Sequence, residues 1–271
     1  MRIGVDVGGT HTDVVCVDGR GELRSVAKVL TTPHDISVGI MEALTSSARL
    51  RNVDELVHGT TVGTNAFVER KLPEIALITT RNFRDILLIR RETKADLYDM
   101  TWSKPEPLVK RQNIFEVSER VLATGAVKER LAADEVRSIA REIRMRGIGV
   151  VAVSLIHAWK NPNHELEIRQ IFADAYPEAA VYLSSEILPE WREFERTYNT
   201  VLNASLAQVL TGYVSNLQGL LRENGFNGEL LVMQSNGGYI SEDDVIARPA
   251  ITMGSGVAGG VMGGCFVGPL V

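Results

Sequence analysis

The densest group of side chains that could bind a phosphate lies within the first thirteen residues. The stretch Asp6–Asp13 has the sequence DVGGTHTD and falls between two apolar, β-branched runs. Its two glycines lack a Cβ, so backbone N–H groups of the turn can approach phosphate oxygens closely. The threonines add hydroxyl donors, and Asp6, at a strand end, could hold Mg²⁺ directly or through water. The candidate phosphate ligands are Gly8, Gly9, Thr10 and Thr12.

A simpler structure explains the same stretch. A β-hairpin with a tight turn needs glycine for its backbone conformation alone, and the spacing of the residues does not separate the two interpretations. The stretch is not a Walker phosphate loop, because no Gly-Lys-Ser or Gly-Lys-Thr follows it.

A second polar group, His58–Thr61, stands at the end of a predicted strand that leads into a helix. Ligands of open α/β sheets bind at this end of the strands. His58 could act as an acid or base or orient a carbonyl, because histidine ordinarily titrates near neutral pH. Thr61, Thr64 and Asn65 could touch a ligand, or they could cap the helix beside a packed histidine.

The remaining polar clusters favour structural roles. His157 and His164 could form a metal pair, but Pro162 between them forces a turn and favours a helix start capped by asparagine. The charge-dense segment 186–196 is typical of a solvated helix with ion pairs, with a carboxylate facing a cleft as the alternative. Residues 235–238 are predicted to form a turn. Surface solubility explains Arg84, Arg90 and Arg91, which could otherwise bind an anion.

A sheet must position these groups. Three β-branched runs joined by short turns, at 2–7, 12–17 and 23–30, predict an antiparallel meander. Strands and helices then alternate, so the predicted fold class is α/β. A loop is predicted over 94–113 and a glycine-rich loop over 254–264. The further predicted strands are 56–58, 75–79, 150–156, 181–183 and 230–234; helices are predicted from about 33–35 onward and over 64–70, 83–88, 134–146, 161–175 and 189–221, the last with a break near Gly212.

Composition narrows the function classes. The 271 residues carry 29 Lys plus Arg and 34 Asp plus Glu, and this net charge of −5 argues against nucleic-acid binding. Cys16 and Cys265 stand too far apart for a disulfide framework or a zinc knuckle, so a reducing cytoplasm is the simplest location. No signal peptide is visible. The uncharged stretch 251–271 contains seven glycines and a proline, which favours turns beside a buried element over a membrane helix.

Asp-x-Gly-Gly-Thr at the start of a three-stranded meander resembles the first phosphate loop of the actin-like ATPase superfamily, whose lobes have a ribonuclease H-like fold. Within it, the chain resembles the hydantoinase A / 5-oxoprolinase family, which includes ATP-using subunits of acetone-type carboxylases. The order of many short stretches makes the resemblance specific. The stretches are Val5–Asp13, His58–Ala66, Ala76–Thr80, Phe83–Asp85, Asp96–Asp99, Lys104–Leu108, Asn161–Glu165, Ser184–Glu186, Pro189–Glu190, Glu195–Arg196, Val232–Gly238 and Ser255–Gly260.

The resemblance implies an ATP-dependent hydrolase subunit that opens a cyclic amide such as a hydantoin, N-methylhydantoin or 5-oxoproline. MgATP would phosphorylate the amide carbonyl oxygen, and water would then open the activated ring. ATP and Mg²⁺ are the implied cofactors, and a hydantoinase B-type subunit is the implied partner. The implied site comprises Asp6 as the Mg²⁺ ligand, Asp6, Asp13 and His58 as catalytic residues, Gly256, Gly259 and Gly260 as further phosphate ligands, and Thr60, Thr61, Asn65 and Asn236 near the substrate.

The sequence departs from the family pattern at three places. His11 stands where the loop usually has Phe, and Val257 replaces the proline of Ser-Gly-Pro-Ala-Gly. The family continues into a second Asp-x-Gly-Gly-Thr loop, and this sequence ends before it. We therefore expect an N-terminal domain over 1–185, the start of a second domain over 186–271, and a missing C-terminal half as a partner.

Three alternatives stay open. A ketone carboxylase subunit would differ in its substrate. A sugar kinase of the same superfamily would share the first loop, but the repressor/kinase branch usually carries a cysteine-rich zinc knuckle, which two distant cysteines cannot form. A truncated subunit with an assembly role would lack autonomous ATPase activity.

Overall fold

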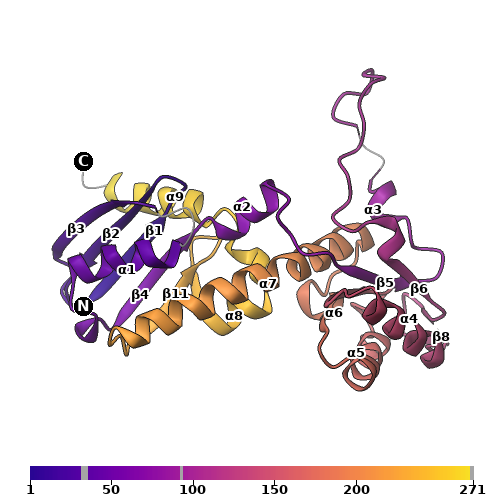
Figure 1. Ribbon diagram of the computed structural model, residues 1–271. Coiled ribbons are helices and arrows are strands. Elements are labelled where there is room, and N and C mark those ends of the chain that lie inside the picture. The colour runs from indigo at the N-terminus through magenta and orange to yellow at the C-terminus, as the bar shows by residue number, and fades with distance from the viewer. Residues whose placement is uncertain (32–35, 92–93, 269–271) are drawn as a thin grey trace. The chain divides into compact units, whose positions relative to one another are not determined.

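The structure, a computed structural model, describes residues 1–31, 36–91 and 94–268 (Figure 1). Its contacts divide the chain into two compact units. Unit 1 is Met1–Leu72 together with Leu206–Val271, and unit 2 is Pro73–Ser205. The contacts thus group the last part of the chain with the first, whereas the predicted boundary at residue 185 divides the chain linearly and stays a prediction.

Unit 1 is built on a six-stranded sheet in the order β12-β11-β4-β1-β2-β3. The predicted meander is confirmed, because β2 pairs antiparallel with both β1 and β3. The strands β4 and β11 then run parallel to β1 and to each other. The bounds are β1 Arg2–Val7, β2 His11–Val17, β3 Leu23–Leu30, β4 Glu55–Thr60, β11 Glu229–Met233 and β12 Tyr239–Ser241.

The two faces of this sheet differ in burial. Ile3, Val5 and Val7 are buried on one face, and the residues between them on β1 are exposed on the other. Helix α1 (Ile36–Ser47) supplies Ile40 and Leu44 to the core of unit 1. The helix start predicted at 33–35 lies outside the described residues. Unit 1 also contains α2 Val62–Val68, the short η1 Leu50–Asn52, α8 Glu242–Ala247, η3 Pro249–Thr252 and α9 Ser255–Val267.

The loop predicted over 254–264 is wrong, because α9 covers nearly all of it. Glycine disfavours a helix by about 1 kcal/mol per residue relative to alanine, so the glycine content pointed to a loop. Most of α9 is exposed, but one glycine makes a close contact with the sheet. A Cβ built on Gly259 would meet Met233 Sδ at 2.9 Å, so glycine lets α9 approach β11 closely.

Unit 2 is built on a four-stranded sheet, β10-β9-β5-β6, in which every pair is parallel. Every residue of β5 (Ala76–Thr80) and β9 (Val150–Ser154) is buried. Such strands are near-continuous apolar runs, because both faces of a parallel sheet are covered. The other strands of unit 2 are β6 Ile114–Val117 and β10 Ala180–Leu183, with a small hairpin of β7 Arg120–Val121 and β8 Val127–Glu129.

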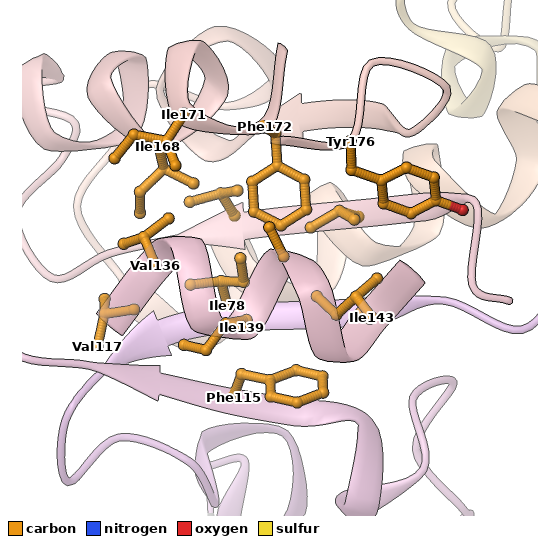
Figure 2. Packing of buried hydrophobic residues seen from close by; sticks show 14 of the residues in the cluster. Ile78, Phe115, Val117, Val136, Ile139, Ile143, Ile168, Ile171, Phe172 and Tyr176 are labelled. Carbon is orange, nitrogen blue, oxygen red and sulfur yellow. The ribbon is translucent and has the colours of Figure 1, made fainter. Parts of the chain in front are cut away.

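Helices α4 (Ala133–Met145) and α5 (Asn163–Ala175) pack together over one face of this sheet (Figure 2). Val136, Ile139 and Ile143 form the buried stripe of α4, as the 3.6-residue period predicts. Phe172 of α5 meets them in the same cluster. A second cluster, which includes Val201 and Ala204, lies around Leu77 and Ala152 of the central strands. The helices predicted over 134–146 and 161–175 are therefore confirmed.

The long predicted helix at 189–221 is α7 Glu193–Glu223, which is continuous through Gly212. The expected break is wrong because Leu210, Val214 and Leu217 are buried on either side, and their burial offsets the cost of one glycine. The helix predicted at 83–88 is a single turn, α3 Ile86–Ile89, and the strand predicted to reach Ile156 ends at Ser154. Unit 2 also contains α6 Ser184–Ile187 and η2 Arg111–Asn113.

No helix in the described parts of the chain combines the length and the apolar character needed to cross a membrane.

Candidate phosphate-binding site

The Gly8–Thr10 turn joins β1 to β2 at the carboxyl end of β1. The Gly8 N–H donates to the His11 carbonyl at 2.9 Å and closes the turn. A Cβ on Gly8 would lie 3.2 Å from that carbonyl oxygen, so the tight closure favours glycine. Gly9 and Thr10 are exposed at the tip. The exposed backbone at the tip is therefore available to a phosphate.

Thr31, directly after β3, clamps this turn. Its hydroxyl donates to the Gly8 carbonyl at 2.9 Å, and its N–H donates to the Thr10 carbonyl at 2.9 Å. The buried hydroxyl of Thr12 lies 3.2 Å from the Thr31 hydroxyl. Thr12 was predicted to touch phosphate, but the structure places its side chain in this clamp beneath the turn. Sequence reasoning missed Thr31, because only the pairing of β2 with β3 brings it to the turn.

A row of charged side chains crosses the sheet beside the turn. Asp6 of β1 is paired with Asp13 of β2, and Asp13 is paired with Lys28 of β3. Lys28 Nζ lies 2.8 Å from Asp13 Oδ1 and 3.0 Å from Oδ2. Partial burial raises the pKa of Asp6, the neighbouring carboxylate of Asp13 raises it further, and Lys28 lowers it. The two aspartates predicted as catalytic are thus side by side.

Gly59 is the neighbour of Asp6 on the other side, on β4. A Cβ at Gly59 would meet Asp6 Oδ1 at 3.0 Å. This contact is tighter than side chains normally accept, so any residue with a Cβ at Gly59 would press on the carboxylate. The absence of a side chain at position 59 leaves Asp6 its present position at the end of the strand.

The residues of this edge fit Mg²⁺ that arrives with a phosphate. In residues 1–31, 36–91 and 94–268, no group of three or more His, Cys, Asp or Glu could hold a metal ion by itself. Mg²⁺ usually takes one or two protein carboxylates, several waters and substrate phosphate oxygens. Asp6 is an exposed hard-oxygen donor whose pKa is raised, and a cation would relieve its repulsion with Asp13. Asp13 is already paired with Lys28.

The start of α9 lies at the same edge of the sheet. The Ser255 hydroxyl donates to the Thr60 carbonyl at 3.3 Å, and the Gly254 N–H lies 3.4 Å from Thr64 Oγ1. Since Thr60 is paired with Val7, the first turn of α9 and the Gly8–Thr10 turn flank the same strand ends. Helix N-termini favour anions. Gly256 and Gly260 are exposed on α9, whereas Gly259 packs against Met233.

Two threonines, Thr60 at the end of β4 and Thr61 directly after it, fasten α2 to this edge. The hydroxyl of Thr61 donates to the Val7 carbonyl at 3.2 Å and accepts from Asn65 Nδ2 at 3.3 Å. The buried Thr60 hydroxyl accepts from the Val62 N–H at 3.2 Å. Thr60 and Thr61 therefore bond to backbone in this structure, while Asn65 is exposed. Their predicted role near a substrate stays a prediction.

His58 does not join the carboxylate row. His58 is paired with Val5 on the buried face of the sheet, and its side chain is 0% exposed. Asp6 and Gly59 are each one residue further along their strands and therefore belong to the opposite face. The Nε2 atom of His58 lies 2.6 Å from the Tyr213 hydroxyl of α7. Burial lowers the pKa of His58 to about 4, and the Val5 backbone opposes this in part. The packed histidine that the sequence left open as an alternative is what the structure shows.

Asn236 also has a local structural role. Its Oδ1 accepts from the Gly238 N–H at 2.9 Å, and Gly237 between them has a φ of 86°. The turn predicted over 235–238 is therefore confirmed, as the connection between β11 and β12. Asn236 is exposed, and the structure places no other described site residue in a hydrogen bond with it.

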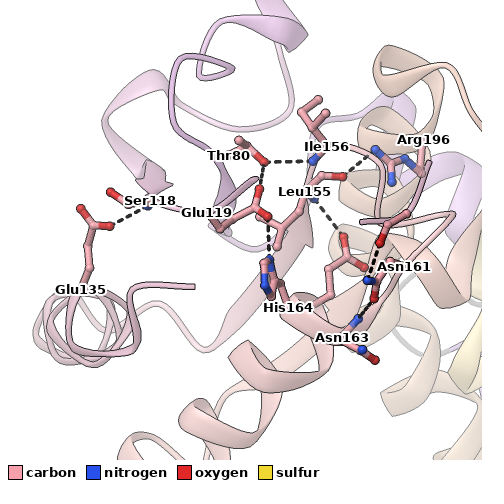
Figure 3. Close-up of polar contacts among 12 residues, drawn as sticks. Thr80, Ser118, Glu119, Glu135, Leu155, Ile156, Asn161, Asn163, His164 and Arg196 are labelled. Carbon is pink, nitrogen blue, oxygen red and sulfur yellow. Dashed lines mark hydrogen bonds and ion pairs between the residues drawn. The ribbon is translucent and has the colours of Figure 1, made fainter. Parts of the chain in front are cut away.

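His164, which could have paired with His157 on a metal, is bonded to a buried carboxylate. His164 Nδ1 lies 2.8 Å from Glu119 Oε2, and Glu119 also accepts from the Thr80 hydroxyl (Figure 3). Thr80 in turn accepts from the Ile156 N–H at 2.9 Å. The predicted helix start is confirmed, since α5 begins at Asn163, but the predicted asparagine cap is wrong, because Pro162 stands at the N-cap position and makes no side-chain cap hydrogen bond. These buried bonds fix the loops at the carboxyl ends of β5 and β9 in unit 2.

A cavity of about 790 Å³ in unit 1 lies elsewhere. Asp54, Glu229 and Leu230 among its lining residues stand at the amino ends of β4 and β11. It is therefore at the opposite edge of the sheet from the Gly8–Thr10 turn. The candidate phosphate site instead comprises the turn, the carboxylates and the start of α9, which are open to solvent.

Comparisons with known proteins point to one family. The family model for the hydantoinase/oxoprolinase N-terminal region matches residues 2–176, and the hydantoinase/oxoprolinase model matches residues 196–267. An uncharacterized protein of Methanocaldococcus jannaschii is 40% identical over 96% of this chain and 39% of its own length. The acetophenone carboxylase gamma subunit of Aromatoleum aromaticum is 32% identical over 97% of this chain and 38% of its own.

A solved structure gives the same answer for the fold. The crystal structure of the ATP-dependent caprolactamase from Pseudomonas jessenii superposes with a TM-score of 0.88 and 29% identity, over 100% of this chain and 41% of that one. The α/β fold with its opening meander is accordingly that of an actin-like ATPase lobe. The chain spans about two fifths of the length of the relatives that it matches.

Proposed function

The chain belongs to the hydantoinase/oxoprolinase family, and from that premise we propose that it supplies the first phosphate-binding lobe of an enzyme that opens a cyclic amide with ATP. The observation that carries the proposal is the joint placement of Asp6, the Gly8–Thr10 turn and the start of α9 at one edge of one sheet. The likeness to an ATP-dependent caprolactamase supports the substrate class.

The proposed reaction consumes one ATP and two waters for each ring opened. The amide carbonyl oxygen attacks the γ-phosphorus, a new O–P bond forms, and ADP leaves with the electrons of the broken P–O bond. A first water then adds to the activated carbon, and the C–N bond breaks with a proton delivered to nitrogen, which leaves an acyl phosphate. A second water cleaves the acyl phosphate and releases inorganic phosphate. Catalysis of this kind is mainly positioning and charge stabilisation.

The chain's own residues position the nucleotide in this proposal. The exposed backbone of Gly9 and Thr10 donates to phosphate oxygens, with the clamp by Thr31 holding the turn in place. The start of α9 adds the positive end of a helix dipole. Asp6 would hold Mg²⁺, with Asp13 beside it, and the ion would offset the negative charge of the phosphates. Lys28 forms an ion pair with Asp13.

The partners and the substrate form part of the proposal. A B-type subunit and a second phosphate loop from the remainder of the family architecture would complete the enzyme, since the relatives matched are named as subunits or are longer chains. The substrate would be a lactam, a hydantoin or 5-oxoproline.

A ketone carboxylase subunit is the second candidate, because the acetophenone carboxylase gamma subunit is among the most similar relatives. The same lobe would serve both reactions, since each begins with phosphoryl transfer to an oxygen. Phosphate release from MgATP, measured with the chain and the proteins that co-purify with it, separates them. Stimulation by caprolactam, hydantoin or 5-oxoproline supports the amidase, and stimulation by acetophenone with bicarbonate supports the carboxylase. Phosphate release that responds to neither contradicts both.

A further inference from the structure

A cavity of about 340 Å³ lies wholly within unit 2. It is lined by Ile156, His157 and Trp159, which follow β9, and by four residues at the start of α7 and just before it: Trp191, Arg192, Glu193 and Arg196. This is the carboxyl edge of a parallel sheet, where α/β proteins bind ligands. The volume falls within the range of small-molecule sites. Sequence reasoning assigned these charged residues to a solvated helix.

Arg196 is the most buried of the lining residues, at 1% exposure. Its Nη2 donates to the Leu155 carbonyl at 2.7 Å (Figure 3). Its Nε and Nη1 are buried and have no hydrogen-bond acceptor among the described residues. A buried guanidinium with unused donors is costly unless an anion is present, because charges in protein interiors are normally paired.

The nearest buried carboxylate does not satisfy Arg196. Glu165 accepts from the Leu155 N–H, the Ser184 hydroxyl and the Ser185 N–H, and no direct ion pair joins it to Arg196. Burial lowers the pKa of Arg196, while the charges of Glu165 and Glu193 oppose this at a distance. The unused N–H groups of Arg196 are therefore left for a group from outside the chain.

The walls of the cavity are aromatic. Trp191 is 65% exposed, although tryptophan usually buries most of its surface. The guanidinium of Arg192 lies over its ring, 5.0 Å from the centroid. Trp159 lines the same cavity, and His157 beside it has a φ of 59°. Burial, Arg120 and Arg196 lower the pKa of His157, with Glu193 and Glu119 opposing, so its ring is neutral at neutral pH.

We propose that this cavity binds a small carboxylate with a flat apolar body. The carboxylate accepts from the free N–H groups of Arg196, and the apolar body packs against the rings of Trp159 and Trp191. The N-terminus of α7, which begins at Glu193, adds partial positive charge. The exposed carboxylate of Glu193 disfavours a dianion such as phosphate. The proposal does not depend on nucleotide binding in unit 1.

Benzoate is a suitable probe, and benzamide is its uncharged match. Trp159 and Trp191 are two of the three tryptophans in the chain, so intrinsic fluorescence reports directly on the cavity. Titration of the full chain with benzoate is expected to give a saturable fluorescence change. Benzamide should bind about tenfold more weakly or worse, which corresponds to the loss of one charge-assisted hydrogen bond. A flat benzoate titration, or equal affinities for the two probes, would overturn the proposal.

Variants of the lining residues test whether benzoate binds in this cavity. Trp191→Ala removes an exposed side chain, so the fold should persist, and benzoate affinity measured by calorimetry should fall about tenfold. Arg196→Lys keeps a cation near the Leu155 carbonyl but removes the Nε and Nη1 donors. It should lower the affinity for benzoate by a similar factor and leave the affinity for benzamide unchanged. Trp102→Phe, outside the cavity, should leave both titrations unchanged. Unaltered benzoate affinity in both Trp191→Ala and Arg196→Lys would place benzoate elsewhere and refute the site.

Discussion

Asp6 and Asp13 stand at directly paired positions of the antiparallel strands β1 and β2, with the charge of Asp13 held by Lys28 one strand further on. Like charges at paired positions destabilise a sheet. A cation bound here would offset the repulsion between the two carboxylates, so the arrangement is suited to cation binding. It also links stability to binding, because the group that would bind the metal is the one that destabilises the free protein.

Gly59→Ala should weaken MgATP binding. The added Cβ would meet Asp6 Oδ1 at 3.0 Å and displace the carboxylate. Loss of one well-placed metal ligand is expected to reduce affinity by about tenfold, or ~1.4 kcal/mol. Gly4→Ala is the matched control, because Gly4 lies on the same face of β1 as Asp6 and has open space around its Cβ position. Calorimetric titration of both variants gives the comparison, and equal affinities would show that the space at Gly59 is immaterial.

Asp6→Asn should stabilise the nucleotide-free chain at neutral pH. The pKa of Asp6 is raised above 3.8, so its ionised form costs the folded state stability, and this cost is present above the raised pKa. The gain from Asp6→Asn should shrink as the pH falls through the raised pKa and vanish below 3.8. Thermal unfolding of parent and variant across that range is the measurement. A variant that is less stable than the parent at neutral pH would contradict the electrostatic argument.

His58 should make stability depend on pH in the weakly acidic range. Its pKa is about 4 in the folded chain against an ordinary value of 6.5, so the unfolded state takes up a proton first. Stability is therefore complete above pH 6.5 and falls as the pH drops toward 4. The full loss is roughly 3 kcal/mol from this buried group.

A variant that lacks only His58 isolates that contribution. His58→Gln is expected to lower stability at neutral pH and to flatten the slope between pH 6.5 and 4 in denaturant titrations. His11→Gln, at an exposed histidine of the same unit, serves as the control. A slope that persists unchanged in His58→Gln would assign the pH dependence to other groups.

Thr31→Val should loosen the Gly8–Thr10 turn. The change removes the hydroxyl that donates to the Gly8 carbonyl and contacts Thr12. The expected cost in the free energy of unfolding is about 1 kcal/mol, with weaker MgATP binding as a second effect. Thr31→Ser retains the hydroxyl and should behave like the parent in both measurements. If Thr31→Val binds MgATP as tightly as Thr31→Ser, the clamp is unnecessary for the site.

The sequence predicts much of the framework but less of the site. The register of β1 in the meander follows from the alternation of Ile3, Val5 and Val7. A shift of the pairing by one residue would move these apolar side chains to the exposed face. The face occupied by His58 depends on the register of β4 against β1, a long-range pairing that local residue types do not encode. The same register gives Gly59 its place beside Asp6.

Two other differences involve tertiary contacts. Glycine content alone predicts a loop at α9, and the close approach of Gly259 to Met233 is a tertiary contact that the local residue types do not reveal. Arg196 belongs to a charge-rich segment that suggests solvent exposure. Its burial at 1% follows from the packing of α7 against the end of β9, which no pattern in the segment reveals.

The most direct test of the central claim is a calorimetric titration of the full chain with MgATP, run in parallel on Asp6→Asn and on Asp134→Asn. Asp134 is a suitable control because its carboxylate is 99% exposed and lies in unit 2. We expect one-site binding in the parent and in Asp134→Asn, and its loss in Asp6→Asn. Binding of equal strength in all three proteins, or no binding to the parent at millimolar MgATP, would contradict it.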